Sequence, residues 1–197
     1  MRVITVTHLK GGAAKTTTAG YLAHALDNMG YKVLAIDADP QGSLLRWSRR
    51  TNWAIPVRHM ANRGLDVQLE GLYTEGYDFA VIDTAPYDLG TVSAAMRAAD
   101  IILVPLPPNF EDVAQVKVTY GVIEGMLHGA DVRILLTRVV ANTLSARDTR
   151  EAMLAAGRTV LETEIPHRQM LAQATASIPS PERGYGGYTG VALELLR

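Results

Sequence analysis

A glycine-rich segment directly follows the first apolar stretch of the chain. Residues 3–6 read Val-Ile-Thr-Val, and residues 10–17 read Lys-Gly-Gly-Ala-Ala-Lys-Thr-Thr. The first stretch predicts a buried strand, and the spacing of apolar residues after Lys15 predicts a helix. A strand that ends in a glycine-rich turn and opens a helix directs backbone N–H groups and the positive end of the helix at one point. This segment therefore predicts a site for the phosphates of a nucleotide between the first strand and the first helix.

The residue types in this segment suit such phosphates. In a P-loop, a lysine reaches the β and γ phosphates, and the hydroxyl side chain after it coordinates Mg²⁺. Lys15 and Thr16 occupy these two places, whereas Leu9 and Ala14 stand where the usual spacing has glycines. The alternative is a glycine-containing surface turn whose lysines only face water.

Two further strands are expected to end in carboxylates. Residues 33–36 read as a short buried strand that leads into Asp-Ala-Asp-Pro-Gln at 37–41. Residues 77–82 read as another, which leads into Asp-Thr-Ala-Pro at 83–86. Ligands of open parallel sheets bind outside the carboxyl ends of the strands, so the three segments predict one site. Taken singly, each Asp could equally belong to an ordinary turn.

Predicted strands and helices alternate along the chain. Strands are expected at 3–6, 33–36, 77–82, 101–104, 133–137 and 159–163, and helices at 15–29, 43–50, 65–75, 91–99, 111–128, 145–156, 169–176 and 188–196. This alternation is typical of a doubly wound α/β fold, with a mostly parallel sheet and helices on both faces. Residues 1–197 show no repeat or interdomain linker and are expected to form a single domain.

Lys10 is a second lysine, five residues before Lys15, and such a lysine is the mark of a deviant Walker A motif. With this motif, the Asp-x-Asp segment at 37–39 and the Walker B-like Asp83, the chain resembles the ParA/MinD family of deviant Walker A P-loop ATPases. Within that family it is most similar to small ParA-type plasmid or chromosome partition proteins. The resemblance extends from residue 2 to about residue 165. It implies a P-loop NTPase fold and slow, Mg²⁺-dependent hydrolysis of ATP.

The resemblance also implies roles for the motif residues. Lys10 and Lys15 would neutralise charge on the phosphates, with Lys10 reaching the partner's nucleotide in a homodimer that encloses ATP. Asp39 would orient the attacking water; its role could be exchanged with that of Asp37, and only one of the two need face the phosphates. The implied catalytic residues are Lys10, Lys15 and Asp39; the metal-binding residues are Thr16, Asp37 and Asp83; the nucleotide-binding residues are Lys10, Gly11, Gly12, Ala13, Ala14, Lys15, Thr16, Thr17, Pro107 and Pro108.

Prolines follow the fourth predicted strand, at positions 105, 107 and 108. Because proline continues neither a strand nor a helix, we expect a rigid loop that begins at Pro105. In the partition ATPases that the chain resembles, a proline-rich loop in this place packs against the adenine base. A stiff connection between strand and helix is the equally open alternative. Many relatives carry Asn-Arg where this chain has Thr137-Arg138, so we expect no base contact there.

Composition excludes several functions. The chain has no cysteine, which excludes disulfides, cysteine zinc sites and iron–sulfur clusters, and with them the nitrogenase iron-protein branch of the superfamily. No apolar run approaches the roughly 20 residues of a membrane span. Residues 188–197 carry too little basic charge for an anionic membrane surface. We therefore expect a cytoplasmic protein with no membrane partner. The resemblance implies that it is nucleoid-associated, and because the chain starts with the strand of the glycine-rich turn, we expect no N-terminal DNA-reading extension.

Arginines are concentrated in two parts of the chain, although its formal net charge is only −1. Residues 41–65 contain no acidic residue and five arginines, which are Arg46, Arg49, Arg50, Arg58 and Arg63. Arg147 and Arg150 share one face of a predicted helix, and Arg168 follows later. Such arginines contact phosphates in non-specific DNA binding, and the resemblance favours the C-terminal group. A solvated charged face is the alternative for each arginine.

The resemblance thus implies a DNA segregation ATPase that binds and hydrolyses ATP with Mg²⁺. The resemblance implies an ATP-sandwich homodimer, non-specific DNA binding, and stimulation by a centromere-binding, ParB-like adaptor. Two alternatives stay open: a ParA-like ATPase that positions a protein cargo, and an ATP-dependent small-molecule synthetase or ligase.

Overall fold

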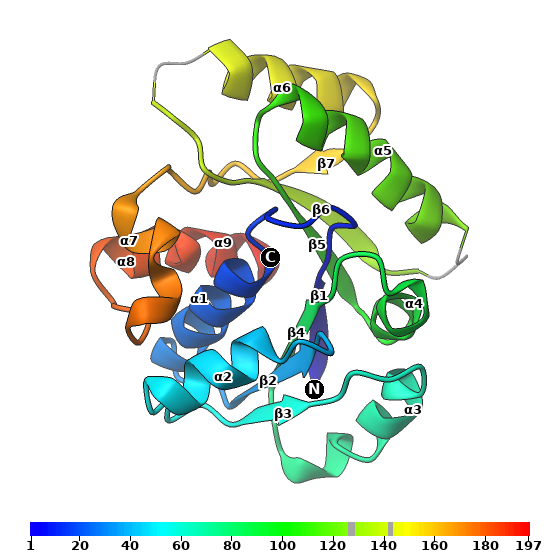
Figure 1. The fold of residues 1–197 in the computed structure, drawn as a ribbon, viewed down its shortest axis with the longest axis vertical. Helices are drawn as coiled ribbons and strands as arrows, with labels where there is room; N and C mark the ends of the chain where they lie inside the picture. The colour runs from blue at the N-terminus through cyan, green and yellow to red at the C-terminus, as the bar shows by residue number, and fades with distance from the viewer. Residues whose placement is uncertain (126–128, 142–143) are drawn as a thin grey trace.

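A parallel sheet forms the centre of the protein. The computed structural model describes residues 1–125, 129–141 and 144–197. Within these residues, seven strands form one sheet in the order β3-β2-β4-β1-β5-β6-β7, and every pair of neighbours is parallel (Figure 1). The strands are β1 Arg2–Val6, β2 Val33–Ala38, β3 Val57–His59, β4 Phe79–Thr84, β5 Ile101–Leu106, β6 Asp131–Leu136 and β7 Thr159–Val160. The predicted doubly wound parallel sheet is confirmed.

Helices cover both faces of the sheet. They are α1 Lys15–Asn28, α2 Ser43–Arg50, α3 Leu65–Glu70, η1 Tyr73–Glu75, α4 Leu89–Arg97, α5 Phe110–Glu124, α6 Leu144–Ala155, α7 Gln169–Ala172, η2 Ala174–Ala176, α8 Arg183–Gly186 and α9 Tyr188–Leu195. α1, α2 and α9 pack on one face, and α3, α4, α5 and α6 pack on the other. None of the described helices combines the length and the apolar character needed to cross a membrane.

Side chains that alternate along each strand supply the two layers of the core. In β2, Val33 and Ala35 face α1 and α2, whereas Leu34 and Ile36 face α3 and α4. All four are buried. Because both faces are covered, the strand reads as a continuous apolar run. The same alternation decides which way the polar residues at the strand ends point.

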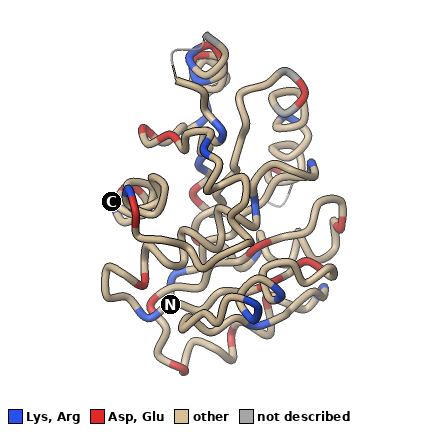
Figure 2. The backbone as a smooth tube through the Cα atoms, turned by 60° about the vertical axis from the view of Figure 1, so that its left-hand side comes forward, with Lys and Arg blue, Asp and Glu red and all other residues tan. Residues whose placement is uncertain are grey.

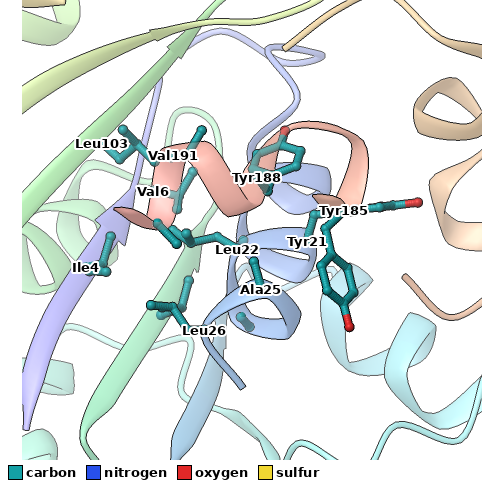
Figure 3. Close-up of a cluster of buried hydrophobic side chains, with 14 of the residues drawn as sticks. Ile4, Val6, Tyr21, Leu22, Ala25, Leu26, Leu103, Tyr185, Tyr188 and Val191 are labelled. Carbon is teal, nitrogen blue, oxygen red and sulfur yellow. The ribbon is translucent and has the colours of Figure 1, made fainter. Parts of the chain in front are cut away.

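The C-terminal helix α9 completes the layer over α1. Figure 3 shows Leu22 of α1 and Val191 of α9 in one cluster with Val6 of β1, and all three side chains are fully buried. The Tyr188 hydroxyl also lies inside, where it shares a hydrogen bond of 2.9 Å with the Thr18 hydroxyl. The helix expected at 188–196 is therefore present, and one side of it belongs to the core.

The expectation that Pro105 ends the fourth strand is wrong, because β5 continues to Leu106. Thr7 donates a backbone hydrogen bond to the Leu103 carbonyl, and Thr137 donates one to the Leu106 carbonyl. Backbone groups alternate in direction along a strand, so Pro105 faces the β1 side, as Leu103 does. The pairing of β1 with β5 stops at Leu103. The N–H that proline lacks therefore leaves no ladder bond unmade.

The other differences between the expected and the observed elements concern the ends of strands and very short strands and helices. β2 and β4 each run two residues beyond their expected ends, so that both carry an aspartate inside the strand. Neither the three-residue edge strand β3 nor the four-residue helix α8 was expected, because such short segments carry too little periodicity. The helix expected at 111–128 is α5, and the last part of that expectation, 126–128, lies outside the described residues.

Candidate functional site

The turn between β1 and α1 has the backbone of a phosphate-binding loop. Gly12 and Ala14 both adopt positive φ, +78° and +65°. An alanine in this conformation costs roughly 1 kcal/mol, because its Cβ crowds the backbone. None of the described side chains caps α1, which begins at Lys15. The first N–H groups of α1 are therefore available to an anion.

Lys15 brings the three sequence motifs together. Its side chain is largely buried, and its ammonium donates to the Lys10 carbonyl at 3.0 Å. Burial lowers the pKa of Lys15, and the nearby carboxylates of Asp83 and Asp39 oppose that effect. The lysine of the glycine-rich turn thus interacts with one aspartate from each of the other two strand ends.

Asp37 has a structural partner for each carboxylate oxygen. Asp37 and Asp83 are register partners on β2 and β4, so both side chains point to the α1 and α2 face. The two Asp37 oxygens accept hydrogen bonds from the backbone N–H groups of Asp39, at 3.1 Å, and Leu45, at 2.8 Å. Burial raises the pKa of Asp37, and the two N–H groups work against that rise. Asp37 therefore ties the end of β2 to the first turn of α2.

Asp83 is equally buried but lacks such partners. Neither of its oxygens accepts a hydrogen bond of normal geometry from the described residues. Burial raises the pKa of Asp83 to about 8, although the nearby Thr16 hydroxyl and Lys15 ammonium lower it. A buried polar group without a partner costs free energy, and a bound cation removes that cost. Thr16 and Asp83 are thus well suited to a Mg²⁺ that arrives with phosphates.

The described residues contain no cluster of three or more His, Cys, Asp or Glu side chains that could hold a metal by itself. A phosphate-bound Mg²⁺ does not need one, because it usually keeps several waters and takes only one or two carboxylates from the protein. The donor set of Thr16 and Asp83 matches that requirement.

Asp39 is the aspartate of the Asp-x-Asp pair that faces open space. One of its carboxylate oxygens accepts a hydrogen bond from the Gln41 N–H at 2.8 Å, and the other accepts no hydrogen bond from the described residues. A cavity of about 320 Å³ lies between this residue and the glycine-rich turn. Its lining residues are Gly11, Gly12, Ala14, Lys15, Thr16, Thr17, Asp39, Thr84, Pro86 and Arg138. Asp37 does not line it, so the arrangement favours Asp39 as the residue that faces phosphates.

A second cavity, of about 270 Å³, adjoins the first and shares Ala14, Thr17 and Arg138 with it. One guanidinium nitrogen of Arg168 is buried without a hydrogen-bond partner among the described residues. Largely apolar walls with a few polar groups are typical of a site for an aromatic base and its sugar. The other lining residues are Thr137, Ile165, Pro166, His167, Arg168, Leu171, Ala172 and Tyr188.

The two prolines assigned to the nucleotide lie elsewhere. Pro107 and Pro108 line a separate cavity of about 240 Å³ with Asn109, Val140 and Ser145. Arg138 also borders it, and therefore borders all three cavities.

Arg138, from which we expected no base contact, borders both the phosphate cavity and the second cavity. The residue adopts a positive φ of 55°, a strained conformation that is often found at functional sites. Its position beside the cavities could have been predicted from the sequence, because Arg138 follows a predicted strand and so lies at the carboxyl edge of the sheet.

Lys10 lies near the start of α5. Its ammonium is 3.1 Å from a carboxylate oxygen of Glu111, and its backbone N–H donates to Nδ1 of His8 at 3.0 Å. The Glu111 side chain is 82% exposed, so the ion pair is screened by water and weak. Such a contact leaves the Lys10 side chain able to exchange it for a phosphate.

The three C-terminal arginines do not form a common unpaired surface. Arg150 donates to the Glu164 carboxylate at 2.9 Å. Arg147 has two acidic neighbours on its own helix, at 3.6 and 3.8 Å. Arg168 lines the second cavity. DNA binding by these three residues stays a prediction.

Comparisons with known proteins agree with this geometry. Residues 4–179 match the family described as "CobQ/CobB/MinD/ParA nucleotide binding domain". The maintenance of carboxysome distribution protein A of Gloeobacter kilaueensis is 39% identical over 168 residues, which cover 84% of this chain and 73% of that protein. The chromosome-partitioning ATPase Soj of Thermus thermophilus is 30% identical over 211 residues, which cover 88% of this chain and 84% of that protein.

The fold is also that of a solved ligand complex. Cobyrinic acid a,c-diamide synthase of Mycobacterium smegmatis, with a bound ATP analog and magnesium, superposes with a TM-score of 0.78. The superposition covers 100% of this chain and 94% of that chain at 23% identity. At this identity the likeness concerns the fold alone, and the fold is one that can hold ATP and magnesium.

Proposed function

The chain belongs to the CobQ/CobB/MinD/ParA family of nucleotide-binding domains, and from this premise we propose that it is a Mg²⁺-dependent ATPase of the ParA type. One observation carries the proposal: Lys15, Thr16, Asp39 and Asp83, from three separate motifs, meet at one edge of the sheet beside an open cavity. In this proposal residues 1–197 act as a single domain, ATP binds between two copies of it, and the dimer holds nucleoid DNA without sequence preference.

Phosphoryl transfer needs positioning and neutralisation of charge more than covalent chemistry. Lys15 and the N-terminus of α1 would bind the phosphates, and Thr16 and Asp83 would hold Mg²⁺. The metal would neutralise negative charge on the phosphate oxygens. Asp39, which lines the cavity, would orient water toward the γ phosphate. Lys10 would leave Glu111 and neutralise charge on the nucleotide of the second copy.

We assign the base and the ribose to the second cavity. It adjoins the phosphate cavity through Ala14 and Thr17, so a nucleoside could continue into it from phosphates bound at the glycine-rich turn. The unpartnered nitrogen of Arg168 would find an acceptor on the nucleoside. This role replaces the DNA contact that the family resemblance suggested for Arg168, and it gives the base a place other than Pro107 and Pro108.

The two relatives support a role in positioning a cargo. One is named for chromosome partitioning and the other for the distribution of carboxysomes. We propose that the ATP-bound dimer holds DNA and that a ParB-like adaptor on a DNA cargo stimulates slow hydrolysis and release. Positioning of a protein cargo is the second candidate, and the 39% identity to the Gloeobacter protein favours it.

Binding of a fluorescent ATP analogue to Lys15→Ala tests the nucleotide site. Loss of a charged contact to phosphate lowers affinity by roughly 100-fold, since such contacts contribute about 1.5–3 kcal/mol. Lys32→Ala, which removes an exposed lysine from the opposite end of the sheet, is the matched control. ATP affinity of Lys15→Ala equal to that of the control would remove the P-loop assignment. Chelation of Mg²⁺ is expected to abolish hydrolysis.

The cargo question needs a second measurement. Binding to a DNA fragment of arbitrary sequence is compared with ATP, with ADP and without nucleotide, for the native chain and for Lys10→Ala. DNA binding that requires both ATP and Lys10 supports the partition ATPase. ATP hydrolysis that ignores DNA but depends on a small carboxylate substrate would instead support the synthetase alternative.

A further inference from the structure

The outward face of α2 carries three arginines. Arg46, Arg49 and Arg50 are spaced i, i+3 and i+4, so they share one side of the helix. All three side chains are exposed, whereas Leu44 and Trp47 on the opposite side are buried in the core. The burial of one side of α2 thus fixes the direction in which the positive charges point.

No carboxylate of the described residues pairs with these arginines. Arg46 donates to the Gln41 carbonyl, and Arg50 donates to the Thr175 carbonyl. Arg49 makes no hydrogen bond or ion pair with the described residues. A bond to a carbonyl orients a guanidinium but leaves its charge uncompensated, so all three charges remain available to an anion.

Other arginines of the protein differ in this respect. Arg58 is paired with Glu75, and Arg150 is paired with Glu164. Figure 2 shows blue and red segments side by side along the helix at the top of the view, which is α6. Segment 41–65, which carries Arg46, Arg49 and Arg50, contains no acidic residue.

We propose that the outward face of α2, formed by Arg46, Arg49 and Arg50, binds the phosphate backbone of DNA. The inference rests on the proposed function and names the surface that performs its DNA-binding step. Arginine forks match phosphate geometry, and positive side chains that contact only phosphates bind DNA without reading its sequence.

The composition of the surface favours DNA over an acidic protein. Protein interfaces need apolar anchors at their centre. No large apolar side chain between residues 41 and 65 is exposed. A groove of about 380 Å³ borders the patch, and Arg49, Asn52 and Trp53 are among its lining residues. The groove adds polar donors beside the arginines and extends the surface along which a phosphate backbone can lie.

The patch is attached to the segment that presents Asp39. α2 begins directly after the turn of residues 39–42, where the Gly42 N–H donates to the Asp39 carbonyl at 2.8 Å. The Asp37 carboxylate holds the N–H of Leu45 in the first turn of the helix. The proposed DNA surface and the proposed ATP site therefore share one continuous, hydrogen-bonded element.

DNA binding across a salt series tests the proposal, with ATP and Mg²⁺ present throughout. The variants are Arg49→Glu and the triple variant Arg46→Ala, Arg49→Ala and Arg50→Ala. Each phosphate contact contributes about 0.9 to the magnitude of the slope of log K against log salt. At 0.1 M salt, the loss of one such contact therefore lowers the affinity for DNA by roughly eightfold. We expect the slope of the triple variant to be smaller by about 3 than that of the native chain. Lys32→Glu, with the same charge change as Arg49→Glu, is expected to bind as the native chain does.

The possible results separate this inference from the proposed function. Native-like DNA binding by both arginine variants would overturn the role of α2 and leave the partition ATPase standing. Failure of the native chain to bind DNA in any nucleotide state would overturn both. Binding of a poly-glutamate peptide instead of DNA, lost in the same variants, would assign the patch to an acidic protein partner. ATP affinity and thermal unfolding check that the fold is intact, and Arg49→Glu loses no hydrogen bond or ion pair with the described residues.

Discussion

The half of the sheet formed by β2, β4 and β1 and the half formed by β5, β6 and β7 build the site in different ways. In the first half, single short segments present Lys15, Asp39 and Asp83, and each follows or ends a strand. In the second half, most of the wall of the second cavity comes from Arg138, from residues of the segment 165–172 and from Tyr188, which are brought together only by packing. The comparison shows that the residues placed to bind phosphates come from short loops, each local in the sequence. The cavity beside them is instead formed by residues that are far apart in the sequence and meet only in the folded chain.

Asp39→Ala gives the largest expected effect and tests the first half. Loss of a residue that orients the attacking water lowers catalysis by about 100-fold or more, while ATP binding persists. Steady-state hydrolysis and equilibrium ATP binding are measured side by side, with Asp37→Asn as the comparison variant. A hydrolysis rate close to that of the native chain would remove Asp39 from this role and break the contrast between the two halves.

Leu195→Ala tests whether the C-terminal helix is part of the core of the domain. Leu195 is 1% exposed, and removal of such a side chain costs about 2–5 kcal/mol of unfolding free energy. Leu193, two residues away, is 51% exposed, and Leu193→Ala is the matched control, with an expected change below about 0.5 kcal/mol. Urea denaturation measures both. Equal effects of the two substitutions would mean that α9 does not support α1.

Arg168→Ala sharpens the assignment of the second cavity. Because its buried nitrogen is proposed to meet the nucleoside, we expect ATP affinity to fall by roughly tenfold, which is about 1.4 kcal/mol. The salt dependence of DNA binding is expected to stay unchanged. The reverse result, with native ATP affinity and a slope reduced by about 0.9, would place Arg168 on a DNA surface.

Ala14→Gly has the smallest expected effect. Glycine relieves the strain of the positive φ at position 14 but loses more conformational entropy on folding, so the unfolding free energy should rise by less than about 1 kcal/mol. Chemical denaturation measures the change, and Ala13→Gly in the same turn is the control. A loss of stability at position 14 would show that the alanine side chain makes a compensating contact.

Some helices and strands could be predicted from the sequence with their observed bounds, and others could not. The sequence predicted α2 with the observed bounds, because its apolar and charged residues have a clear helical spacing. It predicted a break at Pro105 and none occurred, because the direction of a backbone N–H relative to a neighbouring strand is not a property of the residue itself. It missed β3, whose three residues form a strand only because β2 offers an edge for pairing.

The sequence by itself determined the phosphate loop, the parallel α/β fold and the three strand ends that carry Lys15, Asp39 and Asp83. These features follow from periodicity and from loops of a few residues, which depend on neighbours along the chain. Only the tertiary structure decided that Arg150 is neutralised by Glu164 while Arg49 is not, and that Arg138 borders the cavities. Electrostatic pairing and cavity walls depend on which side chains meet after packing, and residues far apart in the chain supply them.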